Sequence, residues 1–137
     1  MGGSIVDRHS GHRVTLDLPV TIDAPGAARH ALDGIDHGFN REQEYTIKLL
    51  ISELVSNSVK HCGVGSVKVE IEATGDSVRV DVIDIGPAFV PGPRTAEPDV
   101  EGGWGLVLVD QLATRWGSVH QSAHVWFELD AAAYAAR

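Results

Sequence analysis

The fold is decided by residues 67–84, which read VKVEIEATGDSVRVDVID. Apolar and polar side chains alternate on both sides of Thr74-Gly75-Asp76, and a period of two is typical of a strand with one buried face. A short glycine-containing segment between two such runs predicts a tight β-hairpin. We therefore expect two paired antiparallel strands near the centre of the molecule.

Asp84 ends the second of these strands. The alternation places its carboxylate on the apolar face, where an ionised group requires hydrogen-bond donors. The exocyclic amine of adenine is one such donor, and Gly86, two residues later, allows the close backbone approach that a flat base needs. The alternative is that the strand ends at Ile83 and that Asp84 begins a turn.

A long helix is predicted before the hairpin, from about Asn40 to Cys62. One side of it carries apolar residues, namely Ile47, Leu50, Ile51, Leu54, Val55 and Val59. Glu53, Asn57 and His61 recur at every fourth position and form one polar row. The oxygen of Asn57 suits magnesium, and Glu53 is placed to orient or deprotonate a nucleophile. Lys60 adds a cation for phosphate, although a solvated helix face would give the same row.

A glycine cluster, Gly102-Gly103-Trp104-Gly105, precedes a second amphipathic segment that begins at Leu106. Residues 86–103 hold four prolines and little periodicity, which is typical of a long loop. At such a transition from loop to helix, the unpaired backbone N–H groups attract anions. The cluster is thus a candidate phosphate site, and a flexible connector is the alternative.

The remaining segments complete an α+β pattern. Residues 14–18 alternate like a strand, an alanine-rich stretch after Pro25 predicts a first helix, and the helix that follows the glycine cluster should end near Trp116-Gly117. Residues 119–129 suggest a last hairpin. We expect a two-layer sandwich with a mixed, mostly antiparallel sheet and helices on one face. Residues 1–11 are expected to be a flexible tail, and residues 12–137 a single ATP-binding domain.

Composition excludes several classes of function. The chain has 137 residues and a formal net charge of −8, and its basic residues are scattered, so direct nucleic-acid binding is not expected. It contains neither an apolar run long enough to span a membrane nor a signal-peptide core, which predicts a cytoplasmic protein. Its single cysteine, Cys62, cannot form an internal disulfide.

The order of these features resembles the Bergerat-fold ATPases, also called the GHKL or HATPase superfamily, and within them the anti-sigma factor serine kinases of the RsbW type. ELVSNSVKH at residues 53–61 resembles the N box of that family. Asp84-Ile85-Gly86 resembles its first glycine box, and Gly103-Trp104-Gly105-Leu106 its second. The resemblance extends over about residues 12 to 130 and implies the Bergerat ATP-binding fold.

The resemblance also implies roles for individual residues. Glu53 would be the general base, Asn57 the magnesium ligand and Asp84 the residue that recognises adenine, while residues 87–102 would form an ATP lid. The other positions expected to contact the nucleotide are Lys60, His61, Gly86, Ala88, Arg94, Gly103, Trp104, Gly105 and Leu106.

Three departures from the family pattern affect its expected chemistry. Pro87-Ala88 stands where a second glycine is usual, and Asp99-Val100-Glu101 stands where kinases of this type often carry an arginine. A threonine expected near the adenine is replaced around Ala123-His124. ATP binding tolerates these changes more easily than phosphotransfer does.

Two functions are compatible with these observations. The first is an ATP- and magnesium-dependent protein serine kinase that sequesters a sigma factor and phosphorylates a STAS-type antagonist, and so regulates transcription. The second is a non-catalytic ATP-binding module that switches partners without phosphotransfer. Either function is compatible with a homodimer.

Overall fold

The computed structural model describes residues 6–9, 12–62, 65–84, 103–119 and 124–131. Within these residues, six strands form one sheet in the order β1-β2-β3-β4-β6-β5. The strands are β1 (Val6–His9), β2 (Arg13–Pro19), β3 (Ser66–Thr74), β4 (Ser77–Asp84), β5 (Arg115–Val119) and β6 (His124–Asp130).

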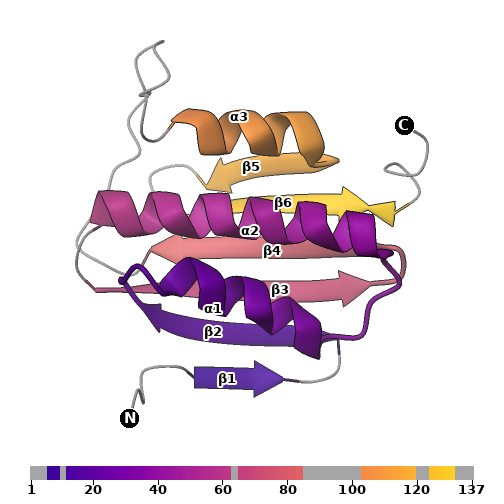
Figure 1. The fold of residues 1–137 in the computed structure, drawn as a ribbon, viewed down its shortest axis with the longest axis horizontal. Helices are drawn as coiled ribbons and strands as arrows, with labels where there is room; N and C mark the ends of the chain where they lie inside the picture. The colour runs from indigo at the N-terminus through magenta and orange to yellow at the C-terminus, as the bar shows by residue number, and fades with distance from the viewer. Residues whose placement is uncertain (1–5, 10–11, 63–64, 85–102, 120–123, 132–137) are drawn as a thin grey trace.

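The helices lie side by side on one face of the sheet (Figure 1). They are α1 (Ala24–Ala31), which continues into the short 3-10 helix η1 (Leu32–Gly34), α2 (Arg41–Cys62) and α3 (Gly103–Leu112). Helix α1 contacts β2, α2 crosses β3 and β4, and α3 lies against β5. The predicted two-layer α+β sandwich is confirmed.

The central hairpin forms as the alternation predicts. Strands β3 and β4 pair in antiparallel register, with Thr74 opposite Ser77. Gly75 between them has a φ of 59°, a left-handed conformation that glycine adopts without a steric penalty. All pairings among the described strands are antiparallel, so this part of the sheet contains no parallel pair of the kind that a mixed sheet would have.

The core lies between the sheet and α2. Each central strand turns alternate residues inward, and the apolar side of α2 covers them. The side chains without exposed surface include Ile47, Leu50, Ile51, Val55, Val67, Val69, Ile71, Val78, Val80 and Phe127. Because the packed positions of α2 are those of the predicted apolar stripe, its polar row is directed away from the centre of the core.

The start of α2 is fixed by a reciprocal pair of hydrogen bonds. The backbone N–H of Gln43 donates to Oδ1 of Asn40, and the backbone N–H of Asn40 donates to Oε1 of Gln43, both at 2.8 Å. This capping box satisfies two N–H groups that a helix terminus otherwise leaves unpaired. Gln43 also donates from Nε2 to the carbonyl of Ala131, which ties α2 to the end of β6.

Two expectations about element boundaries were wrong. Residues Val6–His9, expected in a flexible tail, form β1 and pair with β2 through the backbone, which requires no apolar periodicity. Trp116 and Gly117 were expected at the end of a helix, but they lie in β5. Helix α3 ends earlier because the backbone N–H of Thr114 already donates to the carbonyl of Glu128 in β6.

The sheet face opposite the helices is polar, as the alternation requires. One row across the strands alternates in charge, with Arg13, Glu72, Arg79, Glu128 and Arg115 in successive register positions. Arg79 donates to Glu128, and Arg115 donates to the same carboxylate. Opposite charges thus face each other across neighbouring strands, an arrangement that stabilises a sheet.

Candidate functional site

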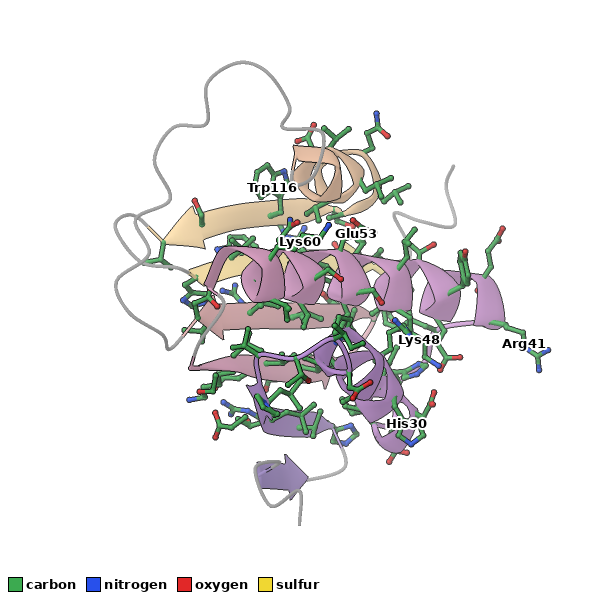
Figure 2. The ribbon with its side chains drawn as sticks, turned by 60° about the vertical axis from the view of Figure 1, so that its left-hand side comes forward. His30, Arg41, Lys48, Glu53, Lys60 and Trp116 are labelled. Atoms are coloured by element: carbon green, nitrogen blue, oxygen red, sulfur yellow. The ribbon has the colours of Figure 1, made fainter. Side chains whose placement is uncertain are left out.

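The polar row of α2 begins beside buried residues that hold its helix against the sheet. Leu54 and Val55 are buried, and Glu53 and Asn57, one helical turn apart, are half-buried. Lys60 is exposed. Figure 2 shows Glu53 and Lys60 on the side of α2 that is turned toward α3. Glu53 and Lys60 therefore lie on the side of α2 that faces a neighbouring helix.

Asp84 is the last residue of β4 and faces the helix layer. It pairs with Val67, which has no exposed surface, and it continues the inward alternation of Val80 and Val82. Its Oδ1 atom is shielded from solvent. The expected position of Asp84 on the buried face is thus confirmed, and the alternative that β4 ends at Ile83 is wrong.

Helix α3 begins at Gly103, inside the glycine cluster. The backbone of Trp104, Gly105 and Leu106 forms its first turn, whose N–H groups have no intrahelical acceptors and whose dipole favours an anion. Further along, Val109 is fully buried and packs α3 onto the core. Residues 103–105 of the glycine cluster therefore begin a packed helix.

The fold gathers three distant parts of the sequence at one end of the molecule (Figure 1). The second half of α2, the end of β4 and the start of α3 all lie there. Asn57, Asp84 and Gly103 thus share this end, although 46 positions separate the first from the last. Contacts of α2 with both α3 and β4 hold the three elements together.

Several expected site residues lie outside the described part of the chain. They are Gly86, Ala88 and Arg94, together with the expected lid over residues 87–102. His61 lies in the last turn of α2, but only its backbone is described. The roles assigned to these residues stay predictions.

One pair that holds the far end of α3 was missed from the sequence. Trp116 of β5 donates from Nε1 to Oδ1 of Asp110 of α3, at 2.9 Å. Figure 2 shows Trp116 beside α3. Asp110 and Trp116 are six residues apart in the sequence. Such a pair can meet across the end of a helix, but the expected helix extended to Trp116 and so hid this possibility.

The chemistry of these groups suits a magnesium nucleotide. In the described part of the chain, no three His, Cys, Asp or Glu side chains come together as a metal cage. Magnesium does not require one, because it accepts one or two protein oxygens and completes its shell with phosphate and water.

Among the described helices, none is long and apolar enough to cross a membrane.

Comparison with known proteins agrees with this arrangement. The family model of the histidine kinase-like ATPase domain matches residues 18–126. The chain therefore belongs to the histidine kinase-like ATPase family, and the expected relationship to the Bergerat-fold ATPases is confirmed.

Within that family the chain is similar to proteins named serine-protein kinase RsbW. The protein from Listeria innocua serovar 6a is 32% identical over 117 residues, which cover 73% of this chain and 74% of that protein. The protein from Listeria monocytogenes serotype 4a has the same identity and coverage. The protein from Oceanobacillus iheyensis is 27% identical over 116 residues, which cover 72% of this chain and 73% of that protein.

Proposed function

We propose that the protein is an ATP-dependent serine kinase that regulates transcription as an anti-sigma factor. The observation that carries this proposal is the gathering of the polar row of α2, Asp84 and the start of α3 at one end of the fold. Relatives named serine-protein kinase support the type of reaction. Family membership supports ATP as the nucleotide.

Asp84 and Asn57 would hold the two ends of the nucleotide. The carboxylate of Asp84 lies on the sheet face that the helices cover. There a hydrogen bond from the adenine amine would offset the free-energy cost of shielding its charge from water. The amide oxygen of Asn57 would contact magnesium. Backbone N–H groups at the start of α3 would contact phosphate, which lets a chain of net charge −8 bind an anion.

Glu53 would act on the protein substrate. It lies one turn before Asn57 on the same row, so its carboxylate is near the proposed metal ligand but displaced from it. There it would accept the proton of a serine hydroxyl as that oxygen attacks. Bound magnesium-ATP would supply the γ-phosphoryl group that the serine oxygen receives, and ADP would leave as the bond between the β- and γ-phosphates breaks. Lys60 adds positive charge on the same side of α2.

The proposed partners are a sigma factor, which the protein would sequester, and a STAS-type antagonist that carries the accepting serine. Both rest on the likeness to RsbW-type anti-sigma factor kinases. A second candidate is a non-catalytic ATP-binding module. Glu101 and Ala88 favour it, because Glu101 puts a negative charge just before the proposed phosphate site and Ala88 stands where a second glycine is usual.

Incubation with γ-labelled ATP, magnesium and a panel of STAS-domain proteins tests the proposal. A kinase transfers label to a serine of at least one of them, and transfer depends on magnesium. Tight ATP binding with no transfer to any member of the panel would instead support the non-catalytic module.

A further inference from the structure

The position of α3 determines where its first turn can meet phosphate, so the contacts that hold the far end of α3 matter to the site. Val109 and Ala113 pack on the core, but apolar packing tolerates small tilts better than a directional bond does. The hydrogen bond from Trp116 Nε1 to Asp110 Oδ1 is directional and has a charged acceptor.

Trp116 is well suited to be the fixed partner of this bond. It faces the helix layer opposite Phe127, which is fully buried, and its ring packs against the core cluster. The flanking turn is also fixed, because Thr114 Oγ1 accepts from the backbone N–H of Asp130 at 2.9 Å. Asp110 is exposed, so the bond restrains a helix surface against an anchored ring.

The bond acts at a distance from the proposed phosphate site. Asp110 follows Gly103 by seven residues, which is about 10 Å along a helix at 1.5 Å per residue. A small rotation of α3 about its packed end is therefore largest at the glycine cluster. Displacements of about 1 Å at a reacting centre can cost about a hundredfold in rate.

We propose that Trp116 and Asp110 are positioning residues. Their hydrogen bond orients α3 so that its first turn faces Glu53 and Asn57 and can contact the phosphates of ATP. The proposal rests on the proposed function, since it assigns phosphate to that turn. An exposed polar pair contributes little to global stability. Its loss should therefore appear in nucleotide affinity and in the local opening of α3 more than in the unfolding of the whole domain.

Three variants test the pair. Trp116→Phe keeps a packed ring and removes the donor, Asp110→Ala removes the acceptor, and Asp110→Asn keeps an acceptor oxygen. Ser118→Ala is the matched control, because Ser118 is exposed and lies two residues along β5 on the same face. The measurements are the Kd for magnesium-ATP by calorimetry, the urea midpoint, and hydrogen exchange of the α3 amides.

We expect Trp116→Phe and Asp110→Ala each to raise the Kd about twofold to fivefold, the most that the hydrogen bond of an exposed pair can contribute. The double variant Trp116→Phe/Asp110→Ala should bind no worse than either single variant. Asp110→Asn keeps an acceptor oxygen without its charge, so its affinity should lie between those of wild type and Asp110→Ala. Amides of α3 should exchange faster in Trp116→Phe than in Ser118→Ala, with similar urea midpoints.

The inference is overturned if wild type binds ATP and both single variants bind it equally well, or if affinity falls only in step with the urea midpoint. It is also overturned if α3 exchanges alike in all variants. Absence of ATP binding by wild type would contradict the proposed function itself, and hydrogen exchange would still report whether the bond restrains α3.

Discussion

The Nε2 atom of His124 lies 2.7 Å from Oδ2 of Asp81, on the sheet face opposite the helices. Arg79 donates to both oxygens of the same carboxylate, from Nε at 2.9 Å and from Nη2 at 3.1 Å. Only 9% of Asp81 is exposed, so its charge depends on these partners. The three side chains connect β4, the strand that ends in Asp84, to β6.

This arrangement makes stability depend on pH in a defined direction. Burial alone would raise the pKa of Asp81, but the hydrogen bonds from Arg79 and His124 outweigh it and leave the pKa below its ordinary value. The stabilisation is therefore present above the unfolded pKa, about 4, and is lost as pH falls through the lower folded value.

Asp81→Asn should lower the free energy of unfolding by about 1–2 kcal/mol at pH 7, because it removes a charge-assisted acceptor. The difference from wild type should begin to shrink below about pH 4, where the carboxyl of the unfolded chain takes up a proton, and should vanish once the carboxyl of the folded protein is neutral as well. Urea unfolding of wild type and Asp81→Asn, at pH 7 and again below about pH 4, measures this difference in stability. Asp36→Asn, at an exposed site, is the control. A difference that stays constant with pH would show that the charge of Asp81 is irrelevant.

Gly117 of β5 lies under the indole of Trp126, its cross-strand partner. A Cβ added at Gly117 would come within 3.1 Å of Trp126 Cζ2, and Arg79 stacks over the same ring at 4.2 Å from its centroid. Gly117→Ala should therefore destabilise the protein by about 1 kcal/mol through overpacking.

The test of this contact is a double-mutant cycle measured by urea unfolding. In a Trp126→Ala background the added methyl group meets no ring, so Gly117→Ala should become neutral or stabilising, as alanine usually is relative to glycine in a strand. An equal loss in both backgrounds would mean that the close approach of Gly117 to Trp126 is not the cause.

The capping box of α2 gives a third prediction. Asn40→Ala should lower the free energy of unfolding by about 1 kcal/mol, because it leaves the backbone N–H of Gln43 without its side-chain acceptor. Asn40→Asp retains a capping oxygen and should stay close to wild type. Thermal unfolding followed by circular dichroism distinguishes them, and similar losses in the two variants would count against the cap.

The fourth prediction concerns phosphotransfer. Glu53→Ala should reduce transfer to a STAS-type serine by about a hundredfold to ten-thousandfold, the usual range for general acid–base catalysis, and change ATP affinity by only a few-fold. Asn57→Ala should instead weaken binding of magnesium-ATP. Single-turnover assays with calorimetry separate these effects. Unchanged transfer in Glu53→Ala would remove Glu53 from the role of base.

Much of the fold follows from local patterns in the sequence. The hairpin of residues 67–84 and the apolar side of α2 were predictable because one face of each element is fully buried, so that periodicity is strict. Strand β1 was not, because an edge strand is held by backbone pairing with one neighbour. Trp116 was misassigned because the end of α3 depends on Glu128, which comes from another strand.

The site was predictable in part. The side of the sheet on which Asp84 lies follows from alternation along β4 alone. The alignment of Asp84 with Asn57 and Gly103 at one end of the molecule depends on how α2 and α3 cross the sheet, which no local pattern specifies. For the same reason the bond between Trp116 and Asp110 required the structure.

The most direct test of the proposed nucleotide site is calorimetric titration of magnesium-ATP into wild type and Asp84→Asn, with both variants shown to be folded. Wild type should bind, and Asp84→Asn should lose about 2 kcal/mol or more of binding free energy, roughly thirtyfold in Kd, because the adenine amine loses a charged, shielded acceptor. No binding by wild type at millimolar ATP, or equal affinity in the two proteins, would contradict the assignment of Asp84 to the adenine.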